Sequence, residues 1–262
     1  MLGGCVSAWF VASLCRVTVE PTTIVALGAC IWLIYTADHL WDAYRLNQPA
    51  HTVRHRFHQN HFRSMLVIFC LIALLGLAIL FYLPWSVIRS GLFLSGGVAL
   101  YFLVFQLAQL HQFIPKELSA ALLYSLGIFL PVFAQVEYWQ LHHTLFFGQY
   151  FFLALANLTI FSYYEYDSDR LDKTSSLATQ YSVSVAQRVA KLSLLSAMIL
   201  LGVVLLFFSP QSSDYFAQLI FMLMIGVLAM VLFFSDLSRH KESYRWIADG
   251  VFLLPIIYLL FA

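Results

Sequence analysis

Two short acidic segments stand out in a sequence that otherwise carries few charges. Asp38 and Asp42 lie four residues apart, Glu165 and Asp169 repeat that spacing, and the two segments hold six of the thirteen carboxylates. Residues four apart share one face of an α-helix, where like charges repel one another. A hard divalent cation such as Mg²⁺ relieves that repulsion and still binds waters or phosphate oxygens. These four carboxylates are therefore the expected metal ligands and catalytic residues, and Asp172 joins them if the second helix continues.

A simpler interpretation is that each acidic pair is only a solvated helix end that faces the lipid headgroups. One such pair does not separate the two interpretations. Two matched pairs favour a shared cation, because carboxylates near a membrane are costly and usually functional.

The segments that must position these acids are expected to be membrane-spanning helices. The chain has 262 residues, of which 61% are hydrophobic and 10% are charged, whereas a soluble domain carries about 25% charged residues. Strand-like alternation is absent, and a helix satisfies its own backbone hydrogen bonds in lipid. The fold class is therefore predicted as all-α and polytopic, with residues 1–262 forming a single domain. The nine expected spans are residues 2–15, 21–42, 63–83, 87–110, 118–138, 145–166, 181–208, 215–235 and 245–262, with the first the shortest; Pro131 and Pro255 are expected to kink two of them.

The basic residues predict the orientation of these spans. Twelve of the fourteen lysines and arginines fall on one side of the membrane, and Arg16 and Arg89 fall on the other. By the positive-inside rule, the N-terminus and both acidic segments are cytoplasmic, and the expected location is the cell membrane of a bacterium. A net charge of +1 argues against a nucleic-acid partner.

At the acidic segments the chain resembles the UbiA superfamily of intramembrane prenyltransferases. That family has nine transmembrane helices and two aspartate-rich motifs, one after span two and one after span six. Asp38 and Asp42 match the DxxxD core of the first motif, Glu165 and Asp169 take the place of the second, and Lys116 resembles the family's diphosphate-contacting lysine between spans four and five. The resemblance extends over almost the whole chain.

The sequence also departs from the family pattern. Ile34 and Tyr35 stand where the first motif begins with Asn-Asp, so one metal-binding aspartate is missing. The second motif begins with Glu165, and Ser176-Leu177 replaces the family's Thr-Leu pair. These differences are typical of a divergent branch rather than of the quinone-pathway enzymes.

The resemblance implies a reaction and a set of ligands. Mg²⁺ would bridge the carboxylates and the diphosphate of a prenyl donor, and the isoprenoid would pass to a lipophilic, aromatic acceptor within the membrane lipids. Lys116, Arg54 and Arg56 would contact the diphosphate, with Lys173 as a further candidate. Two alternatives stay open: a terpene cyclase that needs no acceptor, and a non-enzymatic carrier or lipid-binding protein.

Three histidines, His55, His58 and His61, lie in the basic segment that follows the first acids. A zinc or nickel site is one interpretation of them. A short basic amphipathic helix that lies on the headgroups and covers the site is the favoured one.

Overall fold

A computed structural model of the chain describes residues 1–45, 53–104, 115–172, 174–208, 212–234 and 243–261. All regular secondary structure in these residues is helical. In chain order the elements are α1 (Leu2–Leu14), α2 (Pro21–Arg45), α3 (Val53–Asn60), α4 (Phe62–Ile79), η1 (Leu80–Tyr82), α5 (Trp85–Phe102), α6 (Lys116–Ile128), α7 (Leu130–Gln135), α8 (Leu141–Tyr164), α9 (Tyr166–Asp172), α10 (Leu177–Gln180), α11 (Val183–Phe207), α12 (Ser212–Phe233), α14 (Ser243–Gly250), η5 (Val251–Leu253) and α15 (Ile256–Phe261). The predicted all-α class is confirmed.

Six helical segments of the described residues are long and apolar enough to cross a bilayer: 21–44, 62–82, 141–164, 183–207, 215–233 and 243–261. The chain is therefore an integral membrane protein. The other expected spans also contain helices, although residues 105–110 of the fourth lie outside the described part. The total of nine spans stays a prediction.

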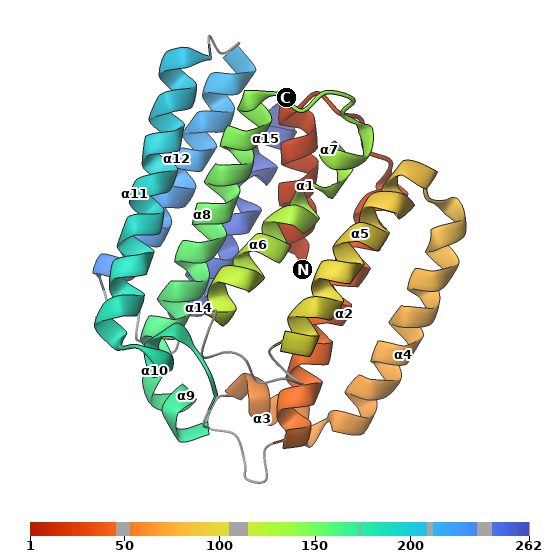
Figure 1. The fold of residues 1–262 in the computed structure, drawn as a ribbon, viewed down its shortest axis with the longest axis vertical. Helices are drawn as coiled ribbons and strands as arrows, with labels where there is room; N and C mark the ends of the chain where they lie inside the picture. Colours follow the sequence, from red (N-terminus) through yellow and green to blue (C-terminus); the bar gives the residue numbers. More distant parts are fainter. Residues whose placement is uncertain (46–52, 105–114, 173, 209–211, 235–242, 262) are drawn as a thin grey trace.

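The first expected span differs from a membrane-crossing helix. Helix α1 has 13 residues, so it is about 20 Å long at about 1.5 Å per residue, which is shorter than the roughly 30 Å of hydrocarbon. Figure 1 places its start about half-way along the long axis of the molecule. Its residues Ala8, Phe10, Val11 and Ala12 have no exposed surface, so α1 is part of the core of the bundle.

Two expected helices are interrupted at their prolines. The segment predicted over 118–138 is divided into α6 and α7 beside Pro131, and the last span changes from η5 to α15 at Pro255. Proline lacks the amide hydrogen that would continue the helix, and its ring clashes with the preceding turn. Both expected kinks are confirmed.

Helix α8 lies at the centre of the packing. It contacts α6, α11, α12 and α14, and the Gln149 amide donates a buried hydrogen bond of 2.8 Å to Gln218 of α12. A methyl group at Gly148 would come within 2.8 Å of Leu200 on α11. Small residues that permit close approach, together with polar side chains that bond across the contact, are the usual means of helix association in lipid.

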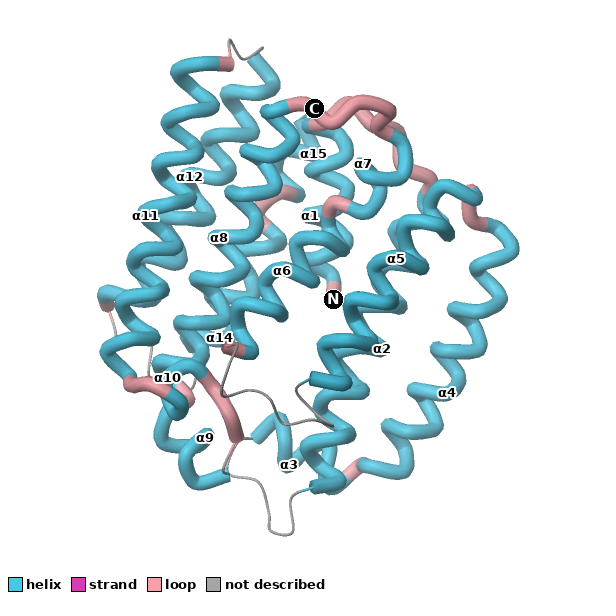
Figure 2. The backbone as a smooth tube through the Cα atoms, viewed as in Figure 1, coloured by secondary structure: helices cyan, strands magenta, loops and turns pink. Residues whose placement is uncertain are grey.

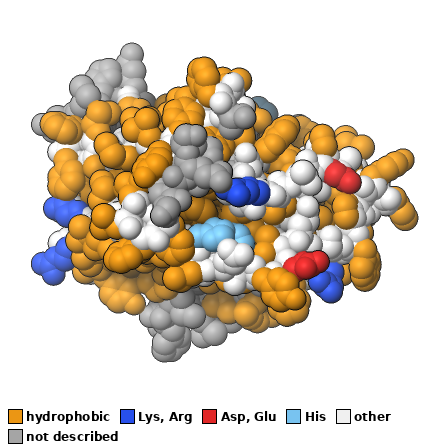
Figure 3. Space-filling model, turned by 90° about the horizontal axis from the view of Figure 1, so that it is seen from above, with side chains coloured by type: hydrophobic (Ala, Val, Ile, Leu, Met, Phe, Trp, Pro, Cys, Tyr) orange, Lys and Arg blue, Asp and Glu red, His pale blue; other side chains and the backbone are white. Residues whose placement is uncertain are grey.

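The two ends of the bundle carry different elements. The end of α2 and the short helices α3, α9 and α10 lie at one end, and the chain connections lie mostly at the two ends (Figures 1 and 2). Seen from the opposite end, the surface is mainly hydrophobic, with few and scattered charged groups (Figure 3). Both acidic segments therefore lie at the same end, as the sequence requires. Helix α4 lies at the outer edge and has no buried residue.

Candidate active site

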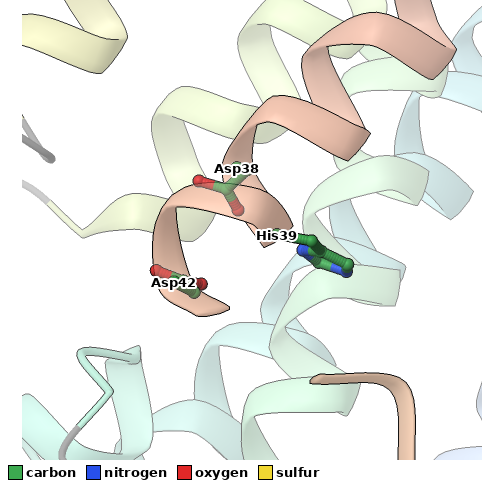
Figure 4. Close-up of side chains that lie close together, drawn as sticks. All are labelled: Asp38, His39 and Asp42. Carbon is green, nitrogen blue, oxygen red and sulfur yellow. The ribbon is translucent and has the colours of Figure 1, made fainter. Parts of the chain in front are cut away.

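The first acidic segment forms the last turns of α2. Asp38 and Asp42 project from one side of the helix, and His39 projects from the adjacent side toward other helices (Figure 4). One potential ligand atom from each of these residues lies within 4.8 Å of the other two. This group has the donor types of a divalent-cation site, with two carboxylates and an imidazole.

Lys116 joins this segment to α6. Pro115 precedes α6 in an extended conformation, and Lys116 is the first helical residue. Its Nζ lies 3.1 Å from Oδ2 and 3.4 Å from Oδ1 of Asp38. Burial alone would lower the pKa of Lys116, but the nearby carboxylates of Asp38 and Asp42 raise it further than burial lowers it. The ammonium group therefore stays charged and is held against the first acidic segment.

Glu117 joins the same turn of α6 to the loop that follows the second acidic segment. Its Oε1 accepts a hydrogen bond of 2.6 Å from the backbone amide of Leu177, and the next amide, that of Ala178, donates to Ser162 Oγ at 2.9 Å. Burial raises the pKa of Glu117, and the Leu177 amide opposes that rise. One helical turn thus contacts both the end of α2 and the start of α10.

The second acidic segment spans a helix break rather than one continuous helix. Helix α8 ends at Tyr164, Glu165 is its C-cap, and α9 begins at Tyr166. The Asp169 amide still donates to the Glu165 carbonyl at 2.8 Å, so the chain turns as a helix does across the junction. The helix of the sixth span therefore does not continue without interruption through this segment, but the i,i+4 spacing of Glu165 and Asp169 is kept across the break, and Asp172 follows on α9.

Glu165 forms a partly buried ion pair with Arg245 of α14. The Nε of Arg245 lies 2.8 Å from Glu165 Oε1, and the two side chains are 13% and 11% exposed. Asp249 Oδ1 accepts a long hydrogen bond of 3.4 Å from Asn157 on α8. Two residues of α14, Arg245 and Asp249, therefore contact α8 or its C-cap.

The remaining acids of the second segment are partly enclosed. Asp169 accepts a hydrogen bond of 3.0 Å from the Thr174 hydroxyl. Burial raises the pKa of Asp169 to about 6, although the hydroxyls of Ser176 and Thr174 favour its charged form. Asp172 is the last residue of α9 and is buried.

Of the three other basic residues expected to contact the diphosphate, the structure describes the side chain of one. The Arg56 side chain is exposed on α3. The Arg54 side chain and all of Lys173 lie outside the described residues, so their roles stay predictions.

Helix α3 forms where an amphipathic helix was expected, and it packs against α2. His58 is buried, with its ring 4.9 Å from that of His39 in an edge-to-face contact. His61 Nδ1 bonds to the Phe57 carbonyl, and the His55 side chain lies outside the described residues. The choice between the amphipathic helix and a histidine metal site stays a prediction.

Sequence reasoning missed three residues of this region: His39, Glu117 and Arg245. His39 lies between the two aspartates, and Glu117 follows the lysine that was singled out, so position alone could have indicated both. Arg245 lies on the same predicted side of the membrane as Glu165, but the 80 residues between them hide the contact in the sequence.

Comparison with solved structures finds a protein with the same arrangement of helices as this chain. The apo structure of a UbiA homolog from Aeropyrum pernix K1 matches with a TM-score of 0.70, covering 99% of this chain and 96% of that one. The chain has the UbiA fold. Sequence identity over this match is 15%, so the fold is shared although most side chains differ. No protein-family model matches the sequence, and no curated protein matches it.

The two acidic segments of this UbiA fold differ in how well they suit a metal ion. Asp38, His39 and Asp42 offer potential ligands within one small volume. The carboxylate oxygens of Asp38 and Asp42 are of the kind that Mg²⁺ binds, and Lys116 also contacts both oxygens of Asp38. Glu165 instead forms an ion pair with the partly buried guanidinium of Arg245.

Proposed function

We propose that this protein is a Mg²⁺-dependent intramembrane prenyltransferase that transfers an isoprenoid from a prenyl diphosphate to a lipophilic, aromatic acceptor. The observation that carries the proposal is the contact of Lys116 with Asp38, beside the contact of Glu117 with Leu177. One turn of α6 brings a cation to the first acidic segment and anchors the loop after the second. The UbiA fold supports the same reaction class.

The reaction requires groups that stabilise negative charge on departing diphosphate. The C–O bond of the donor breaks with its electron pair on the diphosphate, a bond forms between the isoprenoid and the acceptor, and the acceptor releases a proton. When bound, Mg²⁺ would supply electrostatic stabilisation of the diphosphate. Asp38 and Asp42 would hold that ion, and Lys116 would exchange its contact with Asp38 for the diphosphate, because an ammonium is a good point-charge partner for phosphate.

Other parts of the site have supporting roles in this proposal. Arg56, Arg54 and Lys173 are candidate diphosphate contacts from the segments on either side. Asp169 and Asp172 shape the negative field around the second segment. We expect the protein in a bacterial cell membrane, with this end of the bundle facing the cytoplasm, where the water-soluble diphosphate is available.

Binding of prenyl diphosphates to the purified protein tests the proposal. We expect a series of prenyl diphosphates to raise the melting temperature with Mg²⁺ present and to have little effect when EDTA removes it, because a ligand that binds only the folded state stabilises it. Asp42→Asn and Lys116→Gln should each lower the affinity at least tenfold. Absence of any Mg²⁺-dependent stabilisation by any chain length would refute the proposal.

Two exposed residues provide matched controls. Asp167→Asn removes a carboxylate from α9, and Lys191→Gln removes an ammonium from α11, and both native side chains are exposed. Neither variant should change the affinity for prenyl diphosphate. If they weaken binding as much as Asp42→Asn and Lys116→Gln do, the effect is one of general surface charge.

Product analysis separates the transferase from the alternatives. With a prenyl diphosphate and a membrane lipid extract, a transferase forms a prenylated acceptor together with pyrophosphate. A cyclase forms a hydrocarbon or alcohol from the diphosphate alone, and a carrier returns the diphosphate unchanged.

A further inference from the structure

At the end of α8, two consecutive residues meet two consecutive residues of α14. Tyr164 and Tyr244 stack with ring centroids 4.5 Å apart and planes inclined by 16°, and the residues that follow them, Glu165 and Arg245, form the ion pair. The Tyr164 hydroxyl donates to the Val231 carbonyl of α12 at 2.6 Å. Stacking, ion pair and hydrogen bond together fix the position of the guanidinium.

The Arg245 group has the properties of a permanent cation at this position. Its guanidinium carbon lies 5.8 Å from the centre of the Tyr244 ring, a distance at which the ring face attracts a cation. A guanidinium stays protonated at any physiological pH and loses less hydration on burial than an ammonium does. Glu165 therefore has a strong positive partner without any metal ion.

A metal ion at Glu165 would have to displace this partner or share the carboxylate with it. Mg²⁺ needs near-octahedral oxygen ligands at about 2.0–2.1 Å and retains several waters. Glu165 is 11% exposed and its Oε1 already accepts from Arg245. The Arg245 guanidinium thus already takes part of the space beside Glu165 and one of the lone pairs of its carboxylate that the ion would need.

The potential metal ligands converge at the other acidic segment. Within the described parts of the chain, one group of three such side chains lies within ligand-sharing distance, namely Asp38, His39 and Asp42. Across the site, Asp169 bonds to Thr174.

The two segments share a residue spacing in the sequence but have different charge partners in the fold. Asp38 contacts the ammonium of Lys116, which has a flexible side chain. Glu165 contacts a guanidinium that also lies over the Tyr244 ring.

We infer that Arg245 takes the place of a metal ion at the second acidic segment. The active site as a whole then binds one divalent cation, and it does so at Asp38 and Asp42. This inference rests on the proposed function. Glu165 is then a positioning residue that holds Arg245, rather than a metal ligand.

Counting bound Mn²⁺ by electron paramagnetic resonance tests the inference on the purified full-length protein. The wild-type chain should bind one ion. Asp42→Asn should lose it, whereas Glu165→Gln should keep it with an affinity within about twofold of wild type. Two bound ions in the wild type, with one lost in Glu165→Gln, would overturn the inference.

Variants of Arg245 provide a second test of the inference. Arg245→Gln frees the Glu165 carboxylate, so a second, weaker Mn²⁺ should bind; no gain of an ion in folded Arg245→Gln would contradict the inference. If that variant does not fold, the double variant Glu165→Gln/Arg245→Gln removes both charges and should still bind one ion. Arg170→Gln, which alters an exposed arginine of α9, is the matched control and should behave as wild type.

The result also distinguishes the inference from the proposed function. A wild-type chain that binds no Mn²⁺ removes the metal-dependent reaction together with the inference. A chain that binds two ions and also binds prenyl diphosphate with Mg²⁺ keeps the proposed function and removes only the role given to Arg245.

Discussion

Residues with the same spacing in the sequence have different environments in the folded chain. Asp38 contacts the ammonium of Lys116, a side chain that is 29% exposed, whereas Glu165 contacts a guanidinium beside two stacked tyrosines. Spacing along a helix indicates which acids share a face, but it carries no information about which basic residue arrives from another helix. The choice of acids could therefore be made from the sequence, and their partners could not.

The titration of Asp169 gives a prediction at this scale. Burial raises its pKa to about 6, compared with about 3.9 for an unfolded aspartate. The folded chain thus favours the protonated form, and this contribution to stability is complete below about pH 4 and is lost as the pH rises through 6. In EDTA, the wild type should lose up to about 3 kcal/mol relative to Asp169→Asn between pH 4 and pH 7.

Unfolding by sodium dodecyl sulfate at several pH values measures this difference. Asp167→Asn, which changes an exposed carboxylate in the same helix, should follow the wild-type profile. Parallel profiles for wild type and Asp169→Asn would show that the Asp169 carboxyl has an ordinary pKa in the fold.

Helical elements were easier to predict than the breaks within them. Long apolar runs and the prolines at 131 and 255 indicated where helices lie and where two of them are interrupted. The end of α8 at Tyr164 has no such signal, because the residues that follow are compatible with a helix. That break arises from tertiary contacts, since Glu165 pairs with α14 and the chain then turns toward α10.

The first turn of α6 holds the loop before α10, which leads to a prediction at the scale of elements. Glu117→Ala removes the acceptor of the Leu177 amide, and a hydrogen bond to a charged group contributes about 1.5–3 kcal/mol. Amide hydrogens of residues 174–181 should then exchange roughly 10- to 100-fold faster, as measured by mass spectrometry.

The comparison needs one control and one internal reference. Glu137→Ala alters an exposed glutamate in the connection between α7 and α8 and should leave exchange unchanged. Exchange in α12 should also stay at its wild-type rate in Glu117→Ala. Equal acceleration in α12 would indicate general destabilisation, and unchanged exchange at 174–181 would contradict the anchoring role.

For the whole molecule, composition predicted the class of protein, and the acidic motifs predicted the fold. Hydrophobic content indicated a polytopic membrane protein, and the fold agrees with that of a solved UbiA homolog at 15% identity. The sequence could not show that α1 is part of the core of the bundle rather than a membrane span, because a buried 13-residue helix and a short span have the same apolar composition. The side of the membrane that each end faces stays a prediction from the basic residues.

Cysteine labelling tests that orientation. In a chain whose native cysteines at 5, 15, 30 and 70 are replaced by alanine, an impermeant maleimide added to intact cells should label Glu137→Cys. Asp167→Cys should react only after the cells are permeabilised, because it lies at the end of the bundle expected in the cytoplasm. The reverse pattern would place the acidic segments outside the cell.

Helix α4 carries no buried residue, although it is among the most apolar segments of the chain. One face of α4 packs against α2, and every residue of α4 keeps some exposed surface, so the volumes of its outward-facing residues are largely unconstrained by the described part of the protein. The length and the hydrophobicity of α4 must be kept, because the helix has to match roughly 30 Å of hydrocarbon. Leucine, isoleucine, valine and phenylalanine should therefore interchange freely along α4 over evolution, while the seam between α8 and α14 should tolerate almost no exchange.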